Sequence, residues 1–212
     1  MATAPTNLDL QTFRTKLDQY GQVARSCRFA VLIEPQGTNN LLAGQANFYE
    51  MLYVCDAFEF PGRGFDTTEV RYFGPKREVP TNSLYQPANA SFICRNKTTE
   101  RKLFDDWLDI INPIDGYNFN FPSDYYARIT VWEFHDIGKS TGATSGPKIQ
   151  TPTGQLGMGT TAGATPLPIY AWQLNDAWPT LVAPQPVTWA DQDILRLQVT
   201  FTYRNWERIP LV

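Results

Sequence analysis

The chain has a single histidine, His135, and imidazole is the side chain best suited to proton transfer near neutral pH. Glu133 and Asp136 lie beside it in the sequence. A serine or cysteine nucleophile activated by histidine would have to use this one imidazole. We assign no catalytic role to His135 and expect no enzyme activity.

Three isolated cysteines, Cys27, Cys55 and Cys94, lie in apolar, strand-like stretches. An odd number of cysteines without C-x-x-C spacing predicts buried, reduced thiols instead of a disulfide framework or a zinc site. The stretch "PGRGF" at 61–65 contains G-x-G but lacks the rest of a phosphate-binding pattern, so a turn is expected there. We therefore expect neither a metal nor a cofactor.

The elements that would position any site are mainly strands. The stretch "LRLQVTFTYR" at 195–204 alternates strictly, which predicts a strand with one buried and one polar face. Further strands are predicted at 27–35, about 48–59, 88–96 and 125–136, and another in "YAWQLNDAWPTLV". Arms at about 66–73 and 76–81 around Gly74-Pro75 predict a β-hairpin.

One flanking helix is predicted at about 98–112. Thr98 or Thr99 can cap it, Glu100 suits its first turn, and Asn112-Pro113 ends it. Its apolar stripe predicts packing against the core and consists of Leu103, Phe104, Trp107, Leu108 and Ile111. Asp105, Asp106 and Asp109 fall on its solvent side, where charged residues are ordinary. A short N-terminal helix is predicted around Leu8, Leu10, Phe13 and Leu17.

These elements predict a mainly β protein: an antiparallel β-sandwich or barrel with one flanking helix. Residues 138–168 are rich in Gly, Thr and Pro, which predicts a flexible insertion. Because strand patterns resume on both sides of it, we expect a single domain over 1–212.

The composition limits the function classes. Charged residues make up only 18% and aromatic residues 14%, which is typical of a surface occupied by partners or of a β-rich domain. The net charge of −3 argues against tight nucleic-acid binding, which needs clustered Lys and Arg. No apolar stretch is long enough for a membrane helix, and the N-terminus has no signal-peptide pattern, so we expect no membrane anchor and no secretion.

The last third carries a specific pattern: a strand, N-D-A-W-P-T, a turn ending in T-W, and a long alternating strand closing in W-E. This pattern resembles the C-terminal signature of tail-tube proteins from contractile-tailed, T-even-like phages. "RKLFDDWLDII" looks like the single flanking helix of that family, and "CDAFEFPGRGF" with "EVRYFGPKREVP" is similar to its strand, proline turn and long hairpin. The resemblance runs in order over roughly 25–136 and 170–207.

The resemblance implies the sandwich fold shared with the inner tubes of type VI secretion systems and R-type pyocins. It implies a structural virion protein that forms stacked hexameric rings, assembled in the host cytoplasm, with genome DNA passing through without specific binding. Implied partners are sheath, tape-measure and baseplate proteins. The chain is longer than the common tube protein, so a baseplate initiator or tail-terminator ring stays open. A monomeric carbohydrate-binding β-sandwich is a remote alternative.

Two surfaces are then the candidate sites. We expect the hairpin to stack on the next ring through Arg71, Gly74, Pro75, Lys76, Arg77 and Glu78. We expect the polar strand face to line the lumen or a subunit interface through Arg196, Gln198, Thr200, Thr202 and Arg204. Because a DNA conduit must avoid binding DNA, Arg196 and Arg204 should be neutralised by carboxylates on adjacent strands or point at a subunit boundary.

Overall fold

The computed structural model of the chain describes residues 26–37, 40–44, 48–134, 149–151, 154–156, 168–189 and 193–210. It divides into two compact units, one of Phe29–Glu133 with Ile169–Val212 and one of Met1–Arg28 with Phe134–Pro168. In the second of these units, β7 (Ile149–Thr151) pairs antiparallel with β8 (Gly154–Leu156). The predicted N-terminal helix lies outside the described residues.

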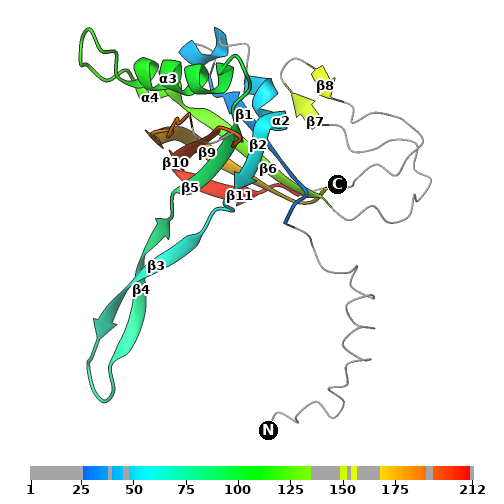
Figure 1. The fold of residues 1–212 in the computed structure, drawn as a ribbon. Coiled ribbons are helices and arrows are strands. Elements are labelled where there is room, and N and C mark those ends of the chain that lie inside the picture. The colour runs from blue at the N-terminus through cyan, green and yellow to red at the C-terminus, as the bar shows by residue number, and fades with distance from the viewer. Residues whose placement is uncertain are drawn as a thin grey trace, which may run out of the picture. The chain divides into compact units, whose positions relative to one another are not determined.

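The larger unit is built on one seven-stranded sheet (Figure 1). Along the sheet the strand order is β1 (Phe29–Pro35), β6 (Ala127–Phe134), β9 (Pro168–Val182), β10 (Arg196–Thr202), β5 (Ala88–Ile93) and β2 (Cys55–Phe58). The seventh strand, β11 (Asn205–Arg208), pairs with β9. The described registers are all antiparallel, so the mainly β, antiparallel fold is confirmed.

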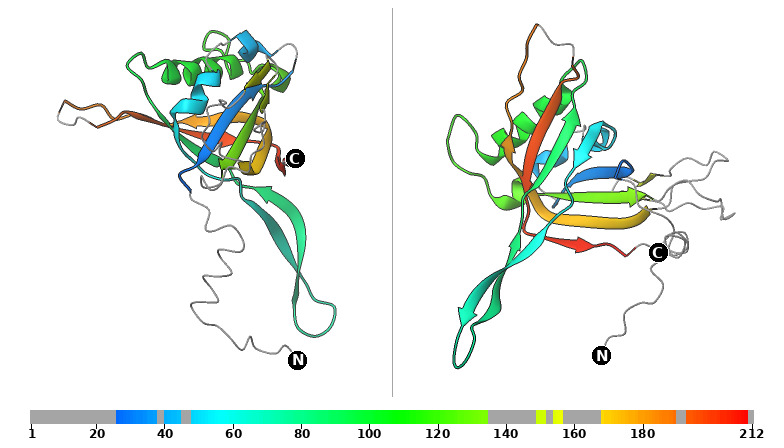
Figure 2. Two further views of the ribbon diagram at one scale, coloured as in Figure 1. Left: turned by 90° about the vertical axis from the view of Figure 1, so that its right-hand side faces the viewer. Right: turned by 60° about the horizontal axis from the view of Figure 1, so that its bottom comes forward.

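The sheet is curved, as Figure 2 shows for the long strand β9. Its inward-facing side chains form one apolar core. In β10 the residues alternate as predicted: Leu197, Val199 and Phe201 are buried, while Arg196 and Gln198 are exposed. Burying each such apolar side chain contributes about 1.5–3 kcal/mol. The same core takes inward-facing residues from β1, β5, β6 and β9, including Val31, Ile33, Phe92, Ile129 and Leu174.

The helix α3 (Thr99–Ile111) confirms the predicted helix and its stripe. Phe104 and Trp107 are fully buried, and both rings pack against Phe201 of β10 with centroids 6.0 and 6.2 Å away. The Trp107 indole N–H donates to the Tyr125 carbonyl oxygen at 2.9 Å. Leu103 and Ile111 are also buried, and Leu108 is half-buried against the same core.

The start of α3 differs from the prediction in its cap. Thr98 takes the cap position with a left-handed backbone (φ 47°), and its side chain makes no capping hydrogen bond. The Glu100 side chain caps this turn instead: it is fully buried, pairs with Arg95, and accepts hydrogen bonds from its own backbone N–H and, at 3.2 Å, from the backbone N–H of Arg95. A carboxylate among the free N–H groups of a helix start is stabilised by the helix dipole.

The strand predicted at 48–59 is wrong in its first half. Residues Phe48–Glu50 form the 3-10 helix η2 and Met51–Val54 form the short helix α2, so β2 begins only at Cys55. Phe48, Met51 and Val54 are the buried residues here. Their spacing of three places them on one side of a helical turn, whereas a strand would have split them between two faces. Two further short helices, η1 (Leu41–Gly44) and α4 (Pro122–Tyr125), were not predicted.

The prediction of a single C-terminal strand is also wrong, because this stretch forms two strands, β10 and β11. β10 pairs with the end of β9 around Trp178–Val182, and β11 pairs with its middle at Trp172–Asn175. Between these segments β9 has a left-handed residue, Asp176, with φ 53°. The C-terminal segment that pairs with β9 must turn where β9 turns, and it does so at 203–204.

Candidate functional site

The polar face of β10 continues over its neighbours. Thr200 Oγ1 donates to Asn89 Oδ1 of β5 at 2.7 Å, and the hydroxyls of Thr202 and Thr180 of β9 lie 3.0 Å apart. Gln198 is exposed opposite Ser91 in the β5–β10 register. The strands β9, β10 and β5 therefore share a face of hydroxyl and amide groups, and β2 adds the Asp56 carboxylate to it.

The two arginines of this face are both paired with carboxylates. Arg196 Nε lies 2.8 Å from Asp56 Oδ2 of β2, and Arg204 Nη1 lies 3.0 Å from Asp176 Oδ2 of β9. Both arginines thus have a carboxylate partner, as expected, but the partner of Arg196 lies on β2, beyond the adjacent strand β5, and not on an adjacent strand. Which way the face points in an assembly stays a prediction.

Asp56 remains charged in this setting. Burial opposes its charge, but hydrogen bonds from Ser91 and Arg196, together with the Arg196 charge, hold the pKa of this carboxyl below its ordinary value. Glu59 also joins the face, because its Oε2 accepts the Asn89 side-chain N–H at 2.8 Å. Three carboxylates against two guanidinium groups leave one excess negative charge on these residues.

The hairpin consists of β3 (Arg63–Val70) and β4 (Arg77–Tyr85), which pair only with each other among the described strands. This confirms the predicted hairpin. Its arms span 63–70 and 77–85, whereas arms at about 66–73 and 76–81 were predicted. Almost all of its residues are exposed, and Figure 2 shows it extending away from the sheet. A lone two-stranded hairpin is at best marginally stable in water, so further contacts must stabilise a hairpin of this length.

Local contacts hold this hairpin. At its base the Arg63 guanidinium lies over the rings of Phe65 and Tyr85, 5.3 and 5.6 Å from their centroids. Near its tip Lys76 pairs with Glu69. The Lys76 charge offsets the repulsion of Glu69 and Glu78, which are register partners.

The predicted stacking residues lie at the turn, 71–76, and at the start of β4. Arg71 Nε donates to the Gly74 carbonyl oxygen at 3.0 Å, and Gly74 has the left-handed backbone (φ 80°) that glycine adopts freely. The sequence reasoning named the charged residues and omitted the aromatic ones. Tyr72 and Phe73 are 89% and 99% exposed at the turn itself.

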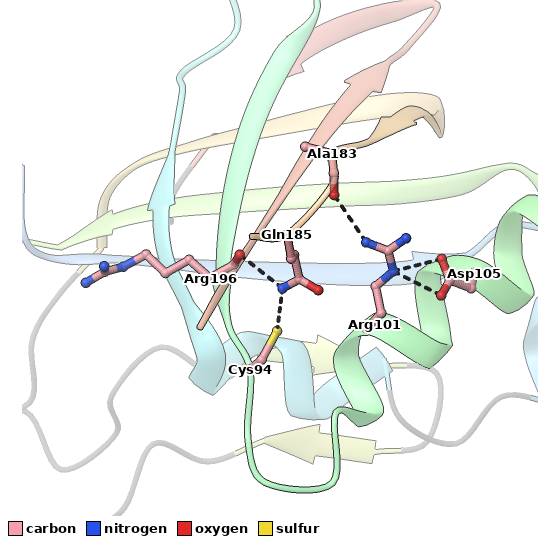
Figure 3. A network of polar contacts seen from close by, with 6 residues as sticks. All are labelled: Cys94, Arg101, Asp105, Ala183, Gln185 and Arg196. Carbon is pink, nitrogen blue, oxygen red and sulfur yellow. Dashed lines mark hydrogen bonds and ion pairs between the residues drawn. The ribbon is translucent and has the colours of Figure 1, made fainter. Parts of the chain in front are cut away.

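The segment after β9 is anchored by a polar network that sequence reasoning missed (Figure 3). Arg101 Nη1 of α3 donates to the Ala183 carbonyl oxygen at 3.1 Å, while its Nε contacts both oxygens of Asp105 at 3.0 Å. Gln185 Nε2 donates to the Arg196 carbonyl oxygen at 3.0 Å and to Cys94 Sγ at 3.2 Å. The Arg101–Asp105 pair is a local contact between residues four apart on α3. The contacts of Arg101 with Ala183 and of Gln185 with Cys94 join residues far apart in the sequence, so no local pattern could predict them.

The cysteine prediction is half right. All three thiols are free, and Cys55 and Cys94 are partly buried, but Cys27 is exposed because it lies in the turn before β1. Burial raises the pKa of the Cys55 thiol to about 12, and the neighbouring Asp56 adds to the rise. No cluster of potential metal ligands occurs within the described ranges.

His135 lies outside the described residues. The letters G-x-S-x-G do occur after it, at 138–142, and they too fall outside. Such letters indicate a nucleophile only in a strand-turn-helix setting. In the part of the chain that the structure describes, no helix is long and apolar enough to cross a membrane.

Solved structures with a similar fold include chains of contractile injection systems. A chain of the PVC sheath-tube complex in its extended state is 14% identical with a TM-score of 0.55, over 97% of this chain and 100% of that chain. A chain of the PVC sheath/tube terminator is 14% identical with a TM-score of 0.54, over 89% and 97%. A chain of the anti-feeding prophage baseplate is 12% identical with a TM-score of 0.55, over 89% and 96%.

These likenesses show that the chain shares the fold of those tube, terminator and baseplate chains. No curated protein matches the chain by sequence. A family model described as "Phage tail tube protein" matches residues 24–209, and the chain belongs to that family. It is accordingly a structural component of a phage tail.

Proposed function

We propose that the chain forms hexameric rings that stack into the tail tube, with the polar face of β9, β10, β5 and β2 as the inner wall. The observation that carries this proposal is the pairing of both arginines on that face with carboxylates. An inner wall must let DNA slide, and each unpaired Lys or Arg would add a phosphate contact in every subunit of every ring.

The dimensions support this assignment. Four strands from each of six subunits make a barrel of roughly 24 strands, and at ~4.8 Å spacing and ~40° tilt its circumference is about 150 Å. The backbone diameter is then about 48 Å, and side chains leave an opening of roughly 35–40 Å. A DNA duplex passes through such an opening. Joining the sheets also removes the exposed edge of β2.

The hairpin β3–β4 is the element that we assign to ring stacking. It has no partner strand within the described chain, and it ends in two exposed aromatic rings. Aromatic side chains and arginine are enriched where proteins bind each other. Sheath and baseplate proteins are the further partners that the likeness to sheath-tube and baseplate structures supports.

Electron microscopy of the purified full chain tests the proposal. Sixfold rings or tubes with an open channel are the expected result, and a stable monomer at high concentration would overturn it. The likeness to a terminator structure supports one second candidate, a ring at a tail end. That candidate predicts single rings that do not grow into tubes.

A further inference from the structure

A surface groove of about 320 Å³ lies where the end of α3 meets the end of β9. This volume falls in the range of roughly 300–1,000 Å³ in which proteins hold ligands. One wall is Trp178-Pro179-Thr180, part of the sequence signature, and of these three residues only Thr180 also belongs to the polar face. We call it the helix-end groove; its lining is Leu108, Asp109, Ile111, Asn112, Phe119, Trp178, Pro179 and Thr180.

The helix-end groove is held in shape by its own loop. Asn120 donates from its backbone N–H to the Ile111 carbonyl oxygen at 3.1 Å and from its side chain to the Ile110 carbonyl oxygen at 2.7 Å. One polar atom of a lining residue has no hydrogen-bond partner among the described residues. This atom is the buried Asn112 Oδ1, and a buried acceptor of this kind costs stability.

The end of α3 and the loop that follows it, which supply Asp109 and Phe119 to the lining, are both apolar and acidic. Ile114, Tyr117, Phe119 and Phe121 are each at least two-thirds exposed, which is unusual for neighbouring apolar side chains. Residues 105–124 contain five aspartates and no lysine or arginine. The groove therefore calls for an apolar or aromatic occupant that carries positive charge.

The hairpin turn has this composition. Its sequence at 71–77, "RYFGPKR", contains three basic residues and no acidic one, and its two aromatic rings have no packing partner in the described chain. Tyr72 also carries a hydroxyl that can donate a hydrogen bond. Figure 1 shows the hairpin turn and α3 at opposite ends of the same unit, so the two surfaces of one copy do not meet.

We propose that the hairpin turn of one copy inserts Tyr72 and Phe73 into the helix-end groove of a copy in the next ring. This inference rests on the proposed function, and it identifies the surface that receives the hairpin. The contact joins two different surfaces, and heterologous contacts of this kind propagate without limit along an axis, as a tube requires. Aromatic anchors in a groove supply the affinity, while Asp109 of the groove and the Arg and Lys residues of the turn fix the partner and its orientation.

A photo-crosslink at the turn tests the contact directly. Full-length Phe73→p-benzoylphenylalanine, assembled from a mixture of normal and heavy-isotope protein, is irradiated and digested. The expected heavy–light crosslinks join residue 73 to peptides from 105–121 or 176–182. Tubes whose crosslinks fall elsewhere, for example on the exposed loop at Val187 and Trp189, would overturn this inference and leave the proposed function standing. A wild-type chain that stays monomeric would contradict both this inference and the proposed function.

A charge exchange gives a second, independent test. Asp109→Lys should raise the protein concentration needed for half-maximal tube formation by about tenfold, because it places like charges in contact. Adding Arg77→Glu to Asp109→Lys should restore most of the loss. Asp106→Lys is the matched control, with the same change on the same helix outside the groove lining, and it should stay within about twofold. Equal effects of both lysine variants, or no rescue, would contradict the proposed contact.

Discussion

Arg204 Nη1 lies 3.0 Å from Asp176 Oδ2, at the corner where β9 turns and the C-terminal strand passes from β10 to β11. The same aspartate has the left-handed backbone, φ 53°, that permits the turn. One residue thus provides both the bend of the sheet and the neutralisation of a polar-face arginine.

Replacing Asp176 separates these two roles. Asp176→Val should destabilise the fold by about 1–2 kcal/mol or more, because a β-branched residue tolerates the left-handed region poorly. Asp176→Asn keeps that tolerance and loses only an ion pair with a mostly exposed arginine, so about 1 kcal/mol or less is expected. Urea denaturation measures both. Equal losses would show that the backbone conformation is not what this position requires.

The buried Glu100 carboxylate should make stability depend on pH. Burial opposes its charge, but hydrogen bonds from its own backbone N–H and from Arg95 hold its pKa below the ordinary value. Its contribution is therefore present above the unfolded value of about 4.3 and is lost as pH falls through the lower folded pKa. Glu100→Gln should cost about 1.5–3 kcal/mol at pH 7 and flatten the drop in melting temperature on acidification.

The exposed Glu78→Gln is the control for that experiment. It makes the same chemical change on the hairpin, and the melting curve of this variant should follow the wild type across the pH range. A Glu100→Gln variant that keeps the full acid-dependent drop would show that other carboxylates cause it.

Deleting residues 73–77 should leave a folded subunit that no longer stacks. The deleted residues are exposed and contribute nothing to the buried core, so the melting temperature should change little. Electron microscopy should show single rings or monomers in place of tubes. Tubes of normal length from this variant would end the assignment of the hairpin to stacking.

Exchanging residues 138–168 for a short Gly-Ser linker should give soluble protein with a similar melting temperature. The segment has too little apolar content to form a core of its own, and a change in loop length costs little entropy. Circular dichroism and thermal melting test this. Loss of soluble protein would show that the insertion is structural.

Removing the carboxylate that neutralises Arg196 should make the inner wall adhere to DNA. Asp56→Asn leaves one more unneutralised guanidinium in each subunit. At 50 mM salt we expect assembled tubes to bind DNA about tenfold more tightly, with a steeper salt dependence. Asp66→Asn makes the same charge change on the hairpin. Retention of labelled DNA that is equal for both variants would place the polar face away from the channel.

Local patterns predicted much of this molecule. Strict alternation predicted the buried Leu197, Val199 and Phe201, because a strand exposes successive side chains to opposite faces whatever its partners are. Helical spacing predicted the stripe that contains Phe104 and Trp107, for the same kind of reason. The hairpin followed from a Gly-Pro turn between two strand-forming arms.

Tertiary structure decided the rest. The C-terminal stretch reads as one strand, yet it breaks at 203–204 because β9, about thirty residues earlier, turns at Asp176. Phe48, Met51 and Val54 lie in short helices because, at a spacing of three, helical turns let all three side chains face the packed core. The strand-forming residues of this stretch had predicted a strand instead. Asp56, Asp176 and the helix-end groove depend on residues far apart in the chain. The sequence determined which faces are apolar and which are polar, since that is a local property of side-chain spacing. Which carboxylate meets which arginine depended on how the sheet bends, and only the packed chain settles that.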